Sequence, residues 1–142
     1  MSTNRKRIIF LLPALYGGGA ERVMINIVNN LDKKFYDIRL VVISEVNLYK
    51  DEVTSEIPIV SLGKKSKWDY IKLVFRLRKV IVDFSPDSVI SFLDYANLMV
   101  IFSSLTFLKR RYKLIISIRN NPLIIHSYSK FGTLEKFLAK IF

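Results

Sequence analysis

The hydrophobic pattern of this chain alternates between short continuous apolar runs and longer stretches with helical spacing. Continuous apolar runs are typical of strands that are covered on both faces of a sheet. One such run is continuous, at residues 8–12, and mostly apolar runs at residues 38–43, 57–62, 88–92 and 114–118 predict four further strands. Pro58, near the start of the third run, indicates an edge strand, because proline cannot donate to a strand ladder.

Helical spacing fills the stretches between these runs. From Ala20 the apolar residues recur at offsets of 0, 3, 4, 7, 8 and 11, which is one stripe of an amphipathic helix. Further helices are expected over residues 66–84, 95–108 and 133–142. The order β-α-β-β-α-β-α-β-α predicts an α/β fold, Rossmann-like, with a mainly parallel sheet and helices on both faces.

Three polar segments directly follow strands of this expected sheet. They are residues 17–19, 94–97 and 119–120. Ligands of open parallel sheets bind beyond the carboxyl ends of the strands. We therefore expect the three segments to converge on one rim and to form a shared site.

Composition and charge narrow the classes of function. Among 142 residues there is no cysteine and one histidine, His126, so a thiolate or multi-histidine metal centre is excluded. Lys and Arg exceed Asp and Glu by 11 charges. Residues 63–142 hold 15 basic and 5 acidic side chains, so nearly all of the excess lies there. Such a charge favours an anionic partner: nucleic acid, a membrane surface or a phosphorylated ligand.

The sequence contains no segment typical of a membrane span or of secretion. The longest stretch without charged residues, Tyr95 to Leu108, has fourteen residues, whereas a spanning helix needs about 20. Pro13 and three glycines interrupt the N-terminal apolar run, which disfavours a signal peptide. We expect a cytoplasmic protein. The apolar face expected over 133–142 continues to the last residue, which predicts a single domain over 1–142 that begins a longer protein.

A glycine-rich turn joins the first strand to the first helix, with the sequence Gly17-Gly18-Gly19-Ala20-Glu21-Arg22. Glycines let a ligand approach the backbone, and the helix N-terminus beyond them attracts anions. The spacing matches neither the dinucleotide-binding fingerprint nor a P-loop. A simple flexible turn is the alternative, in which Glu21 only complements the helix dipole.

Three motifs together resemble the N-terminal domain of family-4 retaining glycosyltransferases of the GT-B fold. They are Gly-Gly-Ala-Glu-Arg-Val at the first helix, Ser91-Phe92-Leu93-Asp94-x-x-Asn97, and the run from Leu114 to Asn120. The resemblance covers essentially all 142 residues, in order, and is greatest to bacterial enzymes that extend lipid-linked glycans in cell-surface polysaccharide synthesis. It implies transfer of a sugar from a nucleotide-sugar donor to a glycan acceptor with retention, and without a metal or other cofactor.

The resemblance also assigns roles to residues of the rim. Gly18 and Gly19 would approach the donor diphosphate and the acceptor, and Gly17 and Glu21 would belong to the same substrate-binding turn. Arg119 stands where the family often has a histidine; an arginine can bind phosphate but cannot act as a general base.

Asp94, Asn97 and Asn120 would contact the sugar acceptor, with Asp94 and Arg119 nearest the chemistry. Asp94 also occupies the position expected for the N-cap of the helix that follows, and the two roles are compatible. The family's second, nucleotide-sugar-binding domain has no counterpart here, so we expect this chain alone not to turn over.

A basic stripe runs along the helix expected over 66–84. At 100° per residue, Lys65, Lys72, Arg76 and Lys79 fall within an arc of about 60°. The resemblance implies that Lys72, Arg76 and Lys79 contact an undecaprenyl-pyrophosphate-linked acceptor and an anionic membrane surface, at the inner face of the cytoplasmic membrane. The alternative is a solvated face whose lysines pair with Asp69 and Asp83. We expect nearby Trp68 to pack in the core, with a bilayer interface as the alternative.

The competing interpretation of the basic charge is a non-enzymatic α/β module that binds nucleic acid or a partner protein. No nucleic-acid-binding motif occurs, and the basic residues share faces with acids instead of alternating with aromatic residues. We therefore favour a nucleotide sugar, a glycan acceptor, a membrane surface and a second domain as partners, and no nucleic acid.

Overall fold

A computed structural model of the chain describes residues 5–45 and 48–118. These residues contain five strands that form one sheet in the order β3-β2-β1-β4-β5, and every pair of neighbours is parallel. The strands are β1 (Lys6–Leu12), β2 (Tyr36–Val42), β3 (Ile59–Ser61), β4 (Ser88–Phe92) and β5 (Lys113–Ser117).

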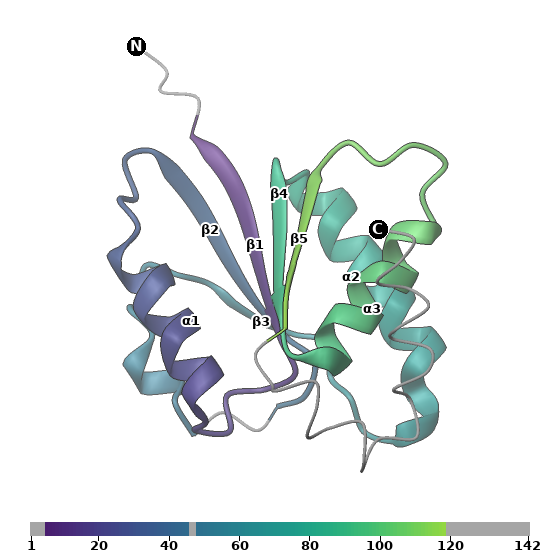
Figure 1. The fold of residues 1–142 in the computed structure, drawn as a ribbon, viewed down its shortest axis with the longest axis horizontal. Helices are drawn as coiled ribbons and strands as arrows, with labels where there is room; N and C mark the ends of the chain where they lie inside the picture. Colours follow the sequence, from purple (N-terminus) through teal and green to yellow (C-terminus); the bar gives the residue numbers. More distant parts are fainter. Residues whose placement is uncertain (1–4, 46–47, 119–142) are drawn as a thin grey trace.

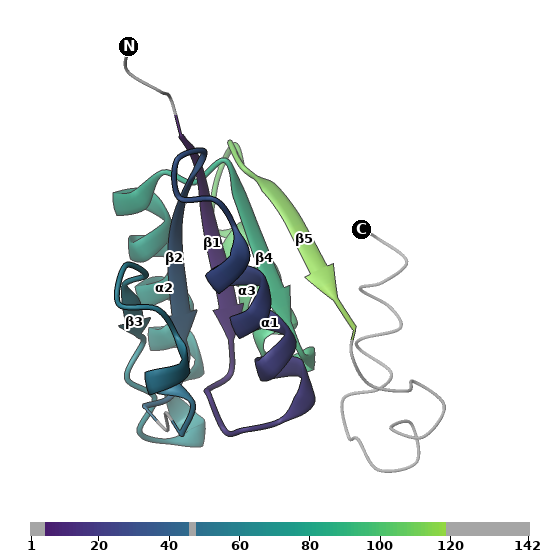
Figure 2. The ribbon, with the colours of Figure 1, turned by 90° about the vertical axis from the view of Figure 1, so that its left-hand side faces the viewer.

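Three α-helices cover the sheet from both sides. They are α1 (Gly19–Asn30), α2 (Tyr70–Phe84) and α3 (Asp94–Leu105), and short 3-10 turns occur at η1 (Lys50–Glu52) and η2 (Lys67–Asp69). Helix α1 lies on one face of the sheet and α2 and α3 lie on the other (Figures 1 and 2). The predicted α/β, Rossmann-like fold with helices on both faces is confirmed.

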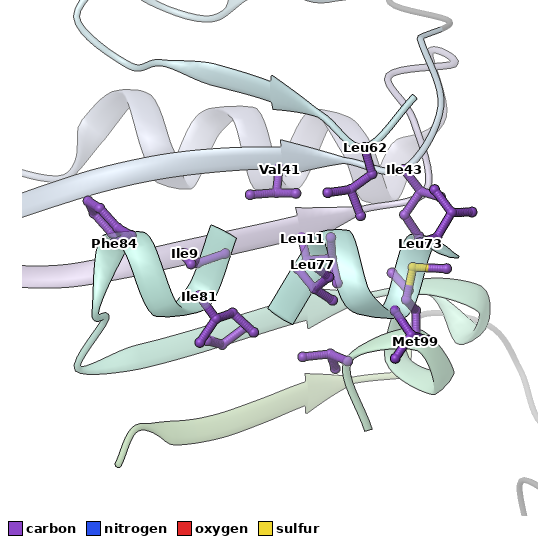
Figure 3. Close-up of a cluster of buried hydrophobic side chains, with 14 of the residues drawn as sticks. Ile9, Leu11, Val41, Ile43, Leu62, Leu73, Leu77, Ile81, Phe84 and Met99 are labelled. Atoms are coloured by element: carbon purple, nitrogen blue, oxygen red, sulfur yellow. The ribbon is translucent and has the colours of Figure 1, made fainter. Parts of the chain in front are cut away.

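The continuous apolar runs arise because each central strand supplies two cores. In β1, Ile9 and Leu11 join the core under α2 and α3, whereas Phe10 and Leu12 join the core under α1. Figure 3 shows the first of these cores, in which the inner side of α2 meets the sheet through Leu73, Leu77 and Ile81. Since alternate side chains of a strand point to opposite faces, a strand buried on both faces needs apolar residues at every position.

The observed elements follow the expected ones with three main differences of length. Helix α2 begins at Tyr70 and not at residue 66, because residues 67–69 form the 3-10 turn η2. Strand β3 is an edge strand, as Pro58 predicted, but has only three residues. Helix α3 ends at Leu105 and not at Leu108, because the N–H of Thr106 turns to the carbonyl of Ser103, at 3.1 Å, which closes a tighter turn. The helix expected over 133–142 lies outside the described residues.

Candidate functional site

The carboxyl ends of β1 and β4 lie side by side at the centre of the sheet, where the chain leaves in opposite directions. Leu11 pairs with Ser91 near these ends. After β1 the chain passes through α1 to β2 on one side, and after β4 it passes through α3 to β5 on the other. Such a switch point leaves a crevice in which doubly wound folds bind ligands. The glycine turn and the segment 93–97 both begin here, while Arg119 and Asn120 lie outside the described residues.

Tyr49 fixes the first glycine of the turn. Gly17 has a φ of +101°, a conformation that residues with a Cβ rarely adopt. The Tyr49 hydroxyl donates to the Gly17 carbonyl at 2.9 Å, and its ring lies 3.3 Å from where a Cβ would stand on Gly17. Arg22 in turn donates to the Tyr49 hydroxyl at 3.1 Å and approaches Glu52 at 3.5 Å. This tether joins positions 32 residues apart, and no local sequence signal indicated it.

The other two glycines differ in what faces them. Gly18 is the N-cap of α1, and a Cβ there would meet Oε2 of Glu21 at 2.6 Å, so no larger residue fits while that carboxylate stays. The buried Glu21 carboxylate lies in the first turn of α1, where a negative charge complements the helix dipole. A Cβ on Gly19 would have no neighbour within 4 Å. Of the three glycines, only Gly19 therefore faces open space.

The turn between β4 and α3 differs from the expected helix cap. Leu93 is the N-cap of α3, with a φ of +72°, and Asp94 is the first helical residue; the prediction that Asp94 caps the helix is wrong. The chain passes from Phe92, the end of β4, into the helix within one residue, and Leu93 makes the required turn with a left-handed φ. A leucine in this conformation stores about 1–3 kcal/mol of strain, which is typical of functional sites.

Asn97 holds three elements of the rim together. Its side chain is buried, Oδ1 accepts a hydrogen bond from the Ser91 hydroxyl at 2.6 Å, and Nδ2 donates to the Ser117 carbonyl at 3.2 Å. Helix α3 is thereby joined to the ends of β4 and β5. No structural reason for this asparagine is apparent from the sequence pattern, and its two hydrogen bonds supply one; a direct contact of Asn97 with the acceptor stays a prediction.

The basic stripe lies on the exposed side of α2. Lys72, Arg76 and Lys79 are all exposed, and Nη1 of Arg76 donates to the carbonyls of Leu62 and Gly63 at 2.7 and 3.2 Å. Within residues 5–45 and 48–118, neither Lys72 nor Lys79 forms an ion pair with Asp69 or Asp83. The pairing proposed for a merely solvated face is therefore not present in this part of the chain.

Asp69 instead organises the start of α2. Its Oδ2 accepts the backbone N–H groups of Ser66 and Lys65 at 2.9 and 3.1 Å, and these bonds hold the pKa of its carboxyl below the ordinary value of 3.8. The Ser66 hydroxyl accepts the N–H of Trp68 at 3.3 Å and completes a capping box. The Trp68 side chain is exposed, so the prediction that it packs in the core is wrong.

The part of the chain that the structure describes contains neither a cluster of metal-ligating side chains nor a helix able to span a membrane. Residues 5–45 and 48–118 contain no cluster of three or more His, Cys, Asp or Glu side chains suited to a metal ion. Over the same residues, no helix combines the length and the apolar character needed to cross a bilayer.

Comparisons of the sequence with known proteins identify no relative of this chain. Neither the models of protein families nor the curated proteins contain a match to this chain. The interpretation of function therefore depends on the motifs and on the geometry described above.

Proposed function

We propose that this chain is the acceptor-side, N-terminal domain of a retaining glycosyltransferase of the GT-B type. Its reaction would transfer a sugar from a nucleotide sugar to a lipid-linked glycan in cell-surface polysaccharide synthesis, at the inner face of the cytoplasmic membrane and without a metal. The donor nucleotide would be held mainly by a second domain that follows in a longer protein. The chain alone would bind acceptor and not turn over.

One observation carries this proposal: the glycine turn and the strained Leu93 turn flank the same switch point. Two of the three motifs that carry the resemblance follow β1 and β4, which are adjacent parallel strands, although these motifs are more than 70 residues apart in the sequence. Of the three glycines, only Gly19 has nothing within 4 Å of the place where a Cβ would stand, and it is the first residue of α1. The free N–H groups at that helix end suit the charge of a diphosphate.

The remaining roles follow from chemistry and position. A retaining transfer without a metal needs stabilisation of the negative charge that develops on the leaving diphosphate. The N–H groups at the N-terminus of α1 would supply part of this stabilisation, and the guanidinium of Arg119 would supply a full positive charge. Asp94, in the first turn of α3, would accept a hydrogen bond from an acceptor hydroxyl. Asn97 would position this turn through its bonds to Ser91 and Ser117.

A second candidate is a non-enzymatic module that binds nucleic acid through α2. The observation that favours it is the set of exposed cations on that helix, Lys72, Arg76 and Lys79, which carry no ion pair to an acid among the described residues. This candidate assigns no role to the glycine turn or to Leu93. It predicts binding that falls steeply with salt and does not involve the rim.

Titration of the isotope-labelled chain, followed by NMR amide shifts, tests the proposal. The probe is an N-acetylhexosamine linked through pyrophosphate to a short, water-soluble prenyl chain. Besides shifts at the α2 cations that the resemblance assigns to the acceptor pyrophosphate, we expect shifts at residues 18–21 and 93–97. Gly19→Val fills the open space above the turn and should abolish these shifts while the far-UV circular dichroism spectrum is unchanged.

The matched control is Asn26→Val, which adds the same side chain to an exposed position farther along α1 and should bind like the parent. An absence of shifts with the pyrophosphate-linked sugar, or equal shifts in the Gly19→Val variant, would overturn the proposal. Shifts on α2 with a single-stranded RNA oligonucleotide, but none with the sugar probe, would favour the second candidate.

A further inference from the structure

The loop that follows β3 brings a lysine, Lys64, to the edge of the sheet at which the strands end. The backbone N–H of Lys64 donates to the carbonyl of Ile43 at 3.0 Å, and the N–H of Ile43 donates to the carbonyl of Leu12 at 3.1 Å. Leu12 is the last residue of β1, and Ile43 directly follows β2. The backbone of Lys64 is therefore fixed to the carboxyl ends of the half of the sheet that contains β1, β2 and β3.

The side chain of Lys64 crosses to the other half of the sheet. Its Nζ lies 4.4 Å from the centre of the Tyr95 ring, and Tyr95 is the second residue of α3, just after the turn that leaves β4. The chain leaves β1 and β4 in opposite directions, so a side chain that joins the two halves at this edge spans the switch point. Lys64 therefore places a positive charge at the crevice in which doubly wound folds bind ligands.

Both parts of this contact are held by further side chains. Nη1 of Arg76, on α2, donates to the carbonyl of Leu62 at 2.7 Å, which fixes the loop that leads to Lys64. The Tyr95 ring packs edge to face against the ring of Tyr70, with 5.9 Å between the ring centres. The cation and the ring beneath it are thus in place before a ligand arrives, so binding does not have to order them.

The charge of Lys64 has no counter-ion in the part of the chain that the structure describes. Over residues 5–45 and 48–118, neither ion pair involves Lys64. Glu45, whose Oε1 lies 3.7 Å from the place where a Cβ would stand on Gly63, is not paired with it. Lys64 is half-buried, whereas the neighbouring Lys65 is exposed. A half-buried cation has lost part of its hydration, so an anion that reaches it is bound more strongly than in open water.

We propose that Lys64 and Tyr95 form a phosphate-binding site at the switch point. The ammonium group of Lys64 donates to phosphate oxygens as a point charge. The Tyr95 ring attracts the ammonium through its quadrupole, which orients the cation and leaves its positive charge for the ligand. The ligand class is a molecule that carries a phosphate or diphosphate group.

This site differs from the two places at which the resemblance expects phosphate. The glycine turn leads into α1 on one face of the sheet, whereas Tyr95 packs on the core under α2 and α3, on the other face (Figure 1). Arg76 of the basic stripe holds the loop of Lys64. Lys64 lies outside the three motifs, and Tyr95 occupies a position that its motif leaves open. Phosphate binding here does not depend on sugar transfer; only its assignment to a nucleotide sugar or to a lipid-linked acceptor rests on the proposed function.

Titration of the isotope-labelled chain with inorganic pyrophosphate, followed by NMR amide shifts, tests the site. We expect saturable shifts at residues 63–65 and 94–96, which give the dissociation constant. Lys64→Gln removes the charge and keeps most of the side-chain length, and it should weaken binding about tenfold or more. Tyr95→Leu keeps an apolar side chain without the ring quadrupole and should weaken binding about twofold to fivefold.

The matched control is Lys34→Gln, which removes the same charge from an exposed position before β2, at the opposite edge of the sheet. It should leave the dissociation constant within about twofold, because a distant exposed charge is screened by salt. Uridine diphosphate and the pyrophosphate-linked sugar probe then distinguish the two sources of phosphate. Whichever of them binds more tightly than inorganic pyrophosphate, and loses this advantage in Lys64→Gln, identifies the compound that uses the site.

Equal dissociation constants for pyrophosphate in Lys64→Gln and Lys34→Gln would overturn the proposal. A merely structural role of Lys64 would lower the urea midpoint of Lys64→Gln and leave its pyrophosphate affinity unchanged, which would also overturn it. Normal binding of the sugar probe at residues 18–21 with unchanged pyrophosphate affinity in Lys64→Gln would refute this site alone. Pyrophosphate binding that requires Lys64, without any response to the sugar probe, would refute the proposed function alone.

Discussion

Alanine substitutions at Gly17 and Gly19 should change stability in opposite directions, although the two positions are two residues apart. At Gly17 the φ of +101° is outside the regions open to alanine, and this strain costs about 1–3 kcal/mol. The new Cβ would also lie 3.3 Å from Cζ of Tyr49. Displacing that ring weakens its hydrogen bond to the Gly17 carbonyl, worth about 1 kcal/mol. We expect Gly17→Ala to lower the free energy of unfolding by about 2–3 kcal/mol.

At Gly19 neither penalty applies. Its φ is not positive, and nothing lies within 4 Å of the place where a Cβ would stand. Alanine restricts the unfolded chain more than glycine does, and this gain is about 0.4–1 kcal/mol where the native conformation is compatible. Gly19→Ala should therefore raise the free energy of unfolding by about 0.5 kcal/mol. The two variants should differ by about 3 kcal/mol.

Urea unfolding followed by far-UV circular dichroism measures both variants against the parent. The free energy of unfolding should fall with urea concentration at the same slope in all three proteins, so that differences between their midpoints report differences in stability alone. Equal losses in the two variants would refute the reasoning, because they would mean that Gly17 and Gly19 occupy similar environments. A loss of more than about 1 kcal/mol in Gly19→Ala would likewise contradict the open space assigned to it.

Two further predictions concern buried polar groups. Asn97→Ala should lower the free energy of unfolding by about 2–3 kcal/mol, because it leaves the buried Ser91 hydroxyl and the Ser117 carbonyl without their partner. In a double-mutant cycle, Ser91→Ala should cost about 1 kcal/mol less in the Asn97→Ala background; strictly additive losses would contradict the bond. Burial raises the pKa of the Tyr70 hydroxyl well above its ordinary value of 10.0, with a smaller contribution from Tyr95. The folded state therefore holds this proton more tightly than the unfolded state, so the stability it contributes is complete below about pH 10 and falls as pH rises further. In the Tyr70→Phe variant the urea midpoint should fall less at alkaline pH than in the parent. At neutral pH the variant should be equally or more stable, since the Tyr70 hydroxyl has no hydrogen-bond partner among the described residues. A loss of stability at neutral pH would contradict the burial of this hydroxyl without a partner.

The spacing of apolar residues predicted the positions of the strands and helices that pack on the core. The run at residues 88–92 coincides with β4, and the stripe from Ala20 coincides with α1, because burial on a sheet or along a helix repeats every two or every 3.6 residues. The glycine turn and the segment after β4 follow the carboxyl ends of two adjacent parallel strands, as their places after the first and fourth apolar runs predicted; the shared site expected there stays a prediction.

Features set by single contacts were not predictable from the pattern. The sequence places an acid before an apolar run at Asp94, as for a cap, but the helix begins one residue earlier than a cap there requires. The covering of Gly17 by Tyr49 depends on the path of the chain after β2, which no spacing encodes. Trp68 was expected in the core because tryptophan is usually well buried. It is exposed because it lies in the 3-10 turn before α2, which directs its side chain away from the core.

The tether from Tyr49 to Gly17 has a consequence for the entropy of binding. Three successive glycines would normally sample many conformations, and a ligand that ordered them would bind more weakly for it. Here the phenol hydroxyl and Arg22 immobilise the first glycine during folding. A molecule arriving at Gly19 therefore meets a backbone that is already in place, held by a side chain from outside the turn.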